Sequence, residues 1–168
     1  MELEFAKYIG TKLIKAKPMT RGEYNAYRGW TLPKNENPDD DGYLIVYVDS
    51  DDYVSWSPKD VFDRAYRSCD GGMTFGGAIE LLKMGFKVAR KGWNGKGMFI
   101  YLQDGSYPYF HQLKEDVQRK LIDSNCTNDS GAVTICPHID MKAADGSIVI
   151  GWLASQTDML ADDWVVVR

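Results

Sequence analysis

The sequence predicts an α+β protein, with a small antiparallel sheet and a packed helix in the C-terminal half and a small α+β module before it. Short β-branched and aromatic runs between turn residues indicate strands, and apolar residues at helical spacing indicate helices. The glycine pair at 71–72 indicates a break between the halves. We therefore expect a hairpin and helix module at residues 1–70 and a second domain at residues 73–168.

In the first half, residues 8–17 predict a short extended or edge segment that Pro18 ends. Residues 19–41 are rich in Gly, Asn, Pro and Asp, a composition typical of an ordered loop. Residues 43–48 and 53–56 are rich in β-branched and aromatic side chains and flank an acidic turn, which predicts a hairpin.

A helix is expected directly after this hairpin. Ser57 suits the cap position, Pro58 suits the first turn, and Asp60 interacts favourably with the helix dipole. The helical spacing places two apolar pairs on one face, namely Val61-Phe62 and Ala65-Tyr66.

The second half begins with a predicted helix at residues 75–84, which Thr74 caps and Gly85 ends. Its expected buried stripe consists of Phe75, Ala78, Ile79 and Leu82. Residues 112–125 are polar and fit either a helix or an extended loop.

The remaining elements predict a small antiparallel sheet. Asp145-Gly146 favours a tight turn, which predicts a hairpin around it. Trp164, at the start of an apolar run, is expected in the core. The expected strands are 87–90, 98–102, 139–143, 147–152 and 164–167, with a short helix at 156–161.

Composition and charge exclude several classes of partner. The net charge of −4, from 20 basic and 24 acidic residues, argues against a nucleic-acid polymer but permits a small anionic ligand. The three scattered cysteines form no CxxC pair and no zinc-like spacing with the two histidines, so no metal or other cofactor is expected. We find no signal-peptide pattern and no apolar run near the roughly 20 residues that span a bilayer. We therefore expect a cytoplasmic protein without a membrane partner.

The first candidate binding segment is residues 90–97, in which three glycines let a ligand approach the backbone amides. Trp93 offers a face for stacking a base, Asn94 suits a base or ribose edge, and Arg90 and Lys96 suit phosphate. A tight β-connection whose tryptophan packs inward explains this segment equally well. The segment is neither a P-loop nor a dinucleotide fingerprint, which argues against triphosphate hydrolysis.

The second candidate segment is a run of four polar residues after an apolar strand that contains Trp152. These residues are Ser155, Gln156, Thr157 and Asp158. Their donors and acceptors suit ribose hydroxyls and base edges. The alternative is that Ser155 or Thr157 caps a short helix and Asp158 favours its dipole. We expect one or two of the four to cap and the others to face a ligand.

Catalytic motifs are not evident in the sequence. His111 and His138 have no nucleophile motif beside them, and the adjacent Asp162 and Asp163 diverge on a regular element. We therefore expect a binding protein and not an enzyme.

Three segments, in this order, resemble the second Thoeris anti-defence family: the Met-Thr-Phe-Gly helix start at 73–76, residues 87–98, and residues 152–164. The resemblance covers residues 73–168. It implies a phage or prophage sponge protein that binds the cyclic ADP-ribose isomers made by TIR-domain immune sensors and blocks effector activation without cleaving them. For some relatives it also implies CBASS-type cyclic dinucleotides or trinucleotides as ligands.

The resemblance further implies a homotetramer in the bacterial host cell, with ligand pockets where subunits meet. By this resemblance Trp93 and Asn94 lie in the pocket, and Trp152 and the run 155–158 face it. Arg90 and Lys96 are preferred over Lys91 as phosphate contacts from strand alternation alone. These residues are the expected signal-binding site.

Two parts of the chain differ from the minimal family pattern. Residues 103–137 are long and polar, and could reshape the pocket or the subunit contacts. Residues 1–70 resemble a module of phage-encoded proteins and could add oligomer contacts, cover the pocket or bind a second ligand. The main alternative for the whole chain is a phage protein-binding adaptor or structural accessory protein, with aromatic side chains as anchors. A second alternative is an enzyme that cleaves the same signals. It would need a general base or a metal cluster near Trp93, and the sequence offers neither.

Overall fold

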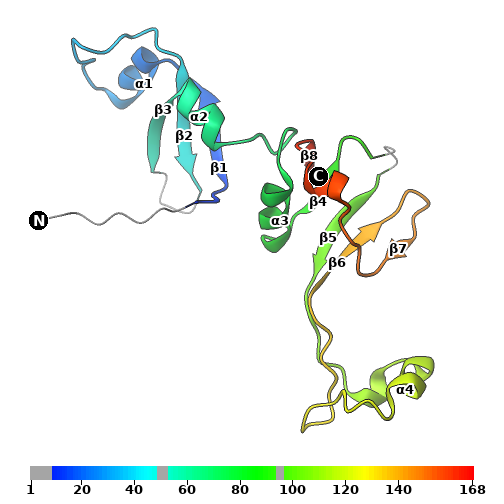
Figure 1. The fold of residues 1–168 in the computed structure, drawn as a ribbon. Coiled ribbons are helices and arrows are strands. Elements are labelled where there is room, and N and C mark those ends of the chain that lie inside the picture. The colour runs from blue at the N-terminus through cyan, green and yellow to red at the C-terminus, as the bar shows by residue number, and fades with distance from the viewer. Residues whose placement is uncertain (1–8, 49–52, 94–96) are drawn as a thin grey trace, which may run out of the picture. The chain divides into compact units, whose positions relative to one another are not determined.

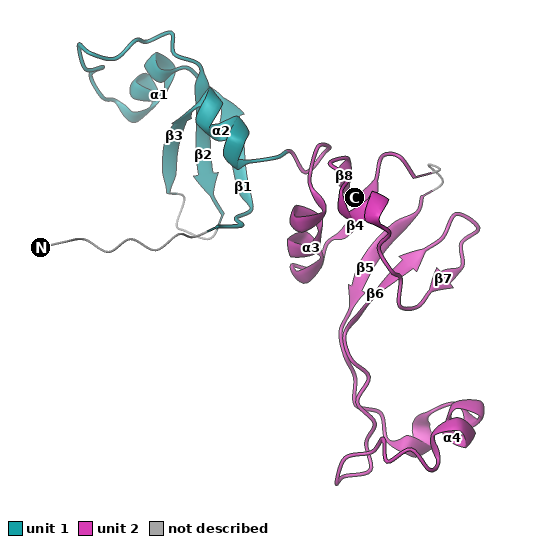
Figure 2. Ribbon diagram, viewed as in Figure 1, with its two compact units in different colours: residues 1–67 teal, residues 68–168 magenta. Residues whose placement is uncertain are grey.

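The computed structural model describes residues 9–48, 53–93 and 97–168. The chain forms two compact units, residues 1–67 and residues 68–168 (Figure 2). Each unit combines helices with its own antiparallel sheet, which confirms the predicted α+β class (Figure 1).

The sheet of the first unit has the order β1-β2-β3, and its strands are β1 (Ile14–Pro18), β2 (Gly42–Tyr47) and β3 (Val54–Pro58). The predicted hairpin is confirmed as the antiparallel pair β2 and β3. Helix α2 (Lys59–Ala65) packs on these two strands, with the Phe62 ring stacked 4.0 Å from that of Tyr43. The cap prediction is wrong, because the cap residue is Pro58 and Ser57 belongs to β3.

Part of the segment predicted as a loop is a helix, α1 (Arg21–Arg28). Thr20 and Glu23 form a reciprocal capping box, and Gly29 ends the helix at a φ of 67°. Tyr24 is buried and anchors α1 in the core of the unit. The compositional argument failed because an eight-residue helix lies inside a segment whose other residues favour turns.

The second unit has a five-stranded sheet with the order β7-β6-β5-β4-β8, antiparallel throughout. Its strands are β4 (Lys87–Arg90), β5 (Phe99–Gln103), β6 (His138–Lys142), β7 (Ile148–Val149) and β8 (Trp164–Val167). Four of these strands lie at or next to their predicted positions, and the β6–β7 hairpin is confirmed. The strand predicted at 147–152 is shorter, because only β7 pairs with β6, and Trp152 follows it instead of belonging to it. The packed helix is α3 (Phe75–Lys83), which contacts β4, β5 and β8 (Figure 1).

Helix α3 begins at the predicted cap, where Thr74 Oγ1 accepts a hydrogen bond from the Gly77 amide at 3.3 Å. Of the predicted stripe, Ala78 and Leu82 are buried and the other two side chains are half-buried. Leu81, which the prediction left out, is also buried. Trp164 is fully buried, as predicted for the core.

Residues 104–137 form an arm between β5 and β6. Its two sides run next to each other away from the sheet, joined by isolated bridges such as Ser106 with Ile135 (Figure 1). The arm contains a 3-10 turn, η1 (Phe110–Gln112), and helix α4 (Glu115–Leu121). Of the two alternatives for residues 112–125, the helix is therefore present, followed by a turn. Over the described ranges, no helix combines the length and the apolar character needed to cross a membrane.

Candidate signal-binding site

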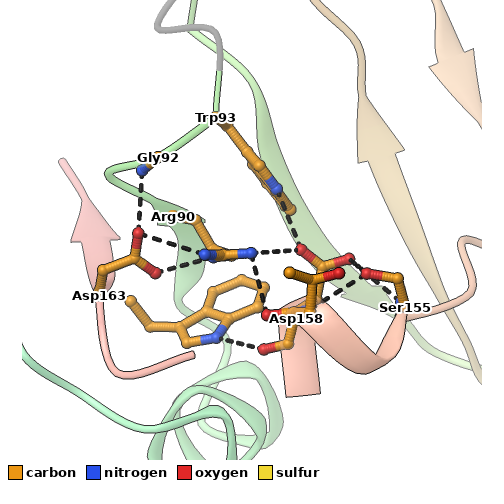
Figure 3. Close-up of polar contacts among 8 residues, drawn as sticks. Arg90, Gly92, Trp93, Ser155, Asp158 and Asp163 are labelled. Carbon is orange, nitrogen blue, oxygen red and sulfur yellow. Dashed lines mark hydrogen bonds and ion pairs between the residues drawn. The ribbon is translucent and has the colours of Figure 1, made fainter. Parts of the chain in front are cut away.

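The site is organised around the guanidinium group of Arg90, at the end of β4. Its Nε donates to Asp163 Oδ1 at 2.7 Å, and its Nη1 donates to Asp158 Oδ1 at 2.9 Å (Figure 3). Nη1 also donates to the Thr157 carbonyl at 3.2 Å. Only 17% of the Arg90 side chain is exposed to solvent. The exposed fraction is 14% for Asp158 and 29% for Asp163. The guanidinium is therefore committed to two carboxylates of its own chain.

Asp158 links Arg90 to the start of α5 (Gln156–Met159). Its Oδ2 accepts hydrogen bonds from the Ser155 amide at 3.1 Å and from Ser155 Oγ at 2.7 Å. The Asp158 amide donates to the same Oγ at 3.1 Å, and this bond and the one from the Ser155 amide form a capping box. The indole Nε1 of Trp93 donates to Asp158 Oδ1 at 3.3 Å, and that of Trp164 donates to the Asp158 carbonyl at 3.1 Å. One aspartate therefore ties the segment after β4, helix α5 and the first residue of β8 together.

These contacts keep both carboxylates ionised. Burial of Asp158 opposes ionisation, but hydrogen bonds from Ser155, Arg90 and Trp93 outweigh it and lower its pKa. The hydrogen bond from Arg90 is the main reason why the pKa of Asp163 is lowered, with a further bond from the Gly92 amide at 3.0 Å. The two carboxylates in turn raise the pKa of Arg90.

Three tryptophans lie beside this network. The ring centroid of Trp93 is 5.9 Å from that of Trp152 and 5.4 Å from that of Trp164, in edge-to-face geometry. Trp164 is buried, whereas Trp93 and Trp152 remain partly exposed. The two partly exposed rings offer the flat apolar surface that a nucleobase needs for stacking.

Two hollows flank the network and the tryptophans. The first, of about 530 Å³, is open and lies beside Arg90; it is lined by Arg90, Gln156, Thr157, Leu160, Ala161, Asp162 and Asp163. The second, of about 440 Å³, is mostly apolar and lies between α3 and the segment that carries Trp152. Both volumes fall in the range of small-molecule sites.

The structure brings several predicted site residues together. Arg90, Trp93, Ser155 and Asp158 share one hydrogen-bond network, and the Trp152 ring adjoins it. Ser155 is a cap, as expected for one or two of the four polar residues.

The other predicted residues divide into two groups. Gln156 and Thr157 are exposed and line the hollow beside Arg90. Asn94 and Lys96 lie outside the described residues, so their predicted roles stay predictions.

Asp163 is the site residue that sequence reasoning missed. The sequence suggested only that its side chain diverges from that of Asp162. The antiparallel register pairs Arg90 with Trp164, which places Asp163 across from the residue after Arg90. A prediction of the β4–β8 pairing would have found it.

The comparison with known families covers the segment that carries this network. Residues 73–167, more than half of the chain, match the model of the Thoeris anti-defense 2-like domain. The chain belongs to the Thoeris anti-defense 2-like family. A relative, Thoeris anti-defense 2 of Bacillus phage SP01, is 35% identical over 102 residues, which cover 56% of this chain and 94% of the relative.

Membership in the Thoeris anti-defense 2-like family supports a phage anti-defence role. The network and its surroundings offer stacking rings, hydroxyls, an amide and carboxylates, groups that suit contacts with a small ligand. In the described part of the chain, no group of three or more His, Cys, Asp or Glu side chains is arranged to hold a metal ion.

Proposed function

We propose that the chain sequesters a small cyclic nucleotide immune signal and does not cleave it, so that the signal cannot activate its effector. The ligand class is the cyclic ADP-ribose isomers of Thoeris, with CBASS-type cyclic dinucleotides or trinucleotides as a further class. The observation that carries this proposal is the pair of partly exposed tryptophans beside a polar helix start, inside the segment matched to an anti-defence family.

The proposed binding mode follows from the groups that are free. The rings of Trp93 and Trp152 contact a base, and the exposed side chains of Gln156 and Thr157 contact ribose hydroxyls or base edges. Arg90 acts mainly by holding Asp158 and Asp163 in place, because its Nε and Nη1 already donate to these two carboxylates. Asn94 and Lys96 are retained as sequence-based candidates for the same ligand.

Sequestration is also proposed to involve a homo-oligomer in the host cell, a tetramer by family resemblance. Three large apolar side chains within eleven residues around α5 are strongly exposed: Ile150 at 75%, Leu153 at 88% and Leu160 at 84%. Such exposure favours a protein contact, which a second copy or a different protein supplies. The same observation supports the second candidate function, a phage protein-binding adaptor.

The test is to mix the purified chain with cyclic ADP-ribose isomers and cyclic dinucleotides, remove the protein, and then heat it and analyse what it releases. Sequestration predicts that an intact signal disappears on mixing and returns on denaturation. Release of an altered nucleotide would indicate an enzyme. No depletion of any nucleotide would contradict the proposal and favour the adaptor.

A pair of matched variants locates the capture in the second unit. Trp93→Ala should abolish depletion. Trp30→Ala removes an exposed tryptophan of the first unit, 52% exposed, and should leave depletion unchanged. Light scattering on the same samples reports the mass of the assembly, and a monomeric mass would contradict the oligomer.

A further inference from the structure

Asp140, on β6, is the one acidic side chain that is buried in the part of the chain that the structure describes, with 5% of its surface exposed. Its Oδ1 accepts a hydrogen bond from the Gly151 amide at 3.0 Å, and His138 Nε2 lies 3.5 Å from the same oxygen. The hydroxyl of Tyr101, its cross-strand neighbour, also bonds to this carboxylate; burial and the nearby charge together raise the pKa of that hydroxyl. A buried carboxylate needs such partners to offset its desolvation.

The carboxylate holds a segment that belongs to the candidate site. Gly151 has a φ of 73°, a conformation that favours glycine, and bonds to Asp140. The next amide, that of Trp152, donates to the Ile139 carbonyl of β6 at 2.7 Å. Two successive amides after β7 are therefore fixed to β6, and the second carries the ring that packs against Trp93.

We propose that Asp140 is a positioning residue of the signal-binding site. Its carboxylate fixes the backbone at Gly151 and so orients the Trp152 ring for contact with a nucleobase; Asp140 itself does not touch the ligand. An amide, a hydroxyl and an imidazole converge on it, which suits an acceptor with two oxygens. Asparagine keeps only one acceptor oxygen, so one of these three groups would face its NH2 group, and the negative charge beside His138 would be lost. The ligand part of this inference rests on the proposed function.

The first measurement is the affinity of the full chain for cyclic ADP-ribose isomers. Asp140→Asn should weaken binding about tenfold, since a displaced ring loses part of its contact with the base. Asp145→Asn is the matched control, because Asp145 lies in the turn of the same hairpin, where its carboxylate accepts hydrogen bonds from the amide and the hydroxyl of Ser147. It should bind like the unchanged chain. Equal affinity of Asp140→Asn and the unchanged chain would overturn the proposal.

A double-mutant cycle separates positioning from general destabilisation. If Asp140 acts through Trp152, Asp140→Asn should cost no further affinity in a Trp152→Phe background. If Asp140 only stabilised the fold, the two substitutions would lower the affinity independently, and their fold losses would multiply. Independent losses would therefore overturn the proposal.

A measurement without ligand separates this inference from the proposed function. The tryptophan fine structure of the near-ultraviolet circular dichroism spectrum reports the packing of tryptophan rings, so Asp140→Asn should change this part of the spectrum while Asp145→Asn should not. If the unchanged chain captures no nucleotide but the spectrum changes, the proposed ligand is wrong and the positioning of Trp152 stands. An unchanged spectrum would overturn the positioning of Trp152 itself.

Discussion

Replacing Arg90 with methionine tests whether the ion-pair network holds α5 and β8 together. The change keeps most of the side-chain volume but leaves Asp158 and Asp163 without their cation. Loss of one partner of a buried ion pair costs about 3–5 kcal/mol. Because solvent reaches 29% of the Asp163 side chain and screens its pair, we expect a smaller cost, about 2 kcal/mol.

Hydrogen–deuterium exchange of the full chain is the suitable assay, since peptides from residues 150–168 report on the second unit alone. A loss of about 2 kcal/mol corresponds to about 30-fold faster exchange in these peptides. Arg90→Lys keeps the charge but loses the forked donors, so its effect should lie between those of the unchanged chain and Arg90→Met. Arg119→Met removes an exposed pair with Glu115 at 3.7 Å and should leave the same peptides unchanged.

The reasoning is refuted if Arg90→Met exchanges at the rate of the unchanged chain. That result would mean that solvent screens both ion pairs and that the β4–β8 pairing and the apolar packing of Trp164 hold β8 without them. Faster exchange in Arg119→Met as well would mean that any loss of a cation has this effect, independent of the network.

Four other outcomes are expected. Because the pKa values of Asp158 and Asp163 are lowered in the folded chain, their contribution to stability should be full above about pH 5 and lost as pH falls through and below about pH 4, as acid denaturation curves would measure. Ser155→Ala should cost about 1 kcal/mol through the lost cap, measured by chemical denaturation. Asp162→Asn should tighten capture of an anionic signal severalfold at low salt, measured by titration. Gly42→Ala should cost about 1–3 kcal/mol in thermal unfolding of the first unit, because its Cβ would overlap the ring of the β3 tryptophan.

Local signals predicted most elements of the fold. Thr74 before an amphipathic run and Asp145-Gly146 between two strands act over a few residues, so the sequence is enough to find α3 and the β6–β7 hairpin. Helix α1 was missed, although Thr20 and Glu23 have the capping-box spacing, because composition was given more weight than this motif.

The site was predicted only in part, for a different physical reason. Trp93 and the run at 155–158 stand out by residue type, which depends on sequence alone. The contacts that these residues make with Arg90 do not, because Asp158 and Asp163 lie 68 and 73 residues away from it in the chain. Only the pairing of β4 with β8 brings them together. The sequence therefore suggested that Arg90 is free to bind phosphate, whereas in the fold two carboxylates neutralise its charge.

The charges in the hollow beside Arg90 restrict how the proposed ligand binds there. The described lining holds one guanidinium, that of Arg90, and two carboxylates, those of Asp162 and Asp163, so it is net negative. A phosphate group placed in it meets repulsion, and Arg90 cannot turn to it without leaving a carboxylate unpaired. Ribose hydroxyls and base amino groups, in contrast, donate well to carboxylates. We therefore expect the sugar and base edges to enter this hollow, and the phosphates to be met by backbone amides or by cations from elsewhere in the assembly.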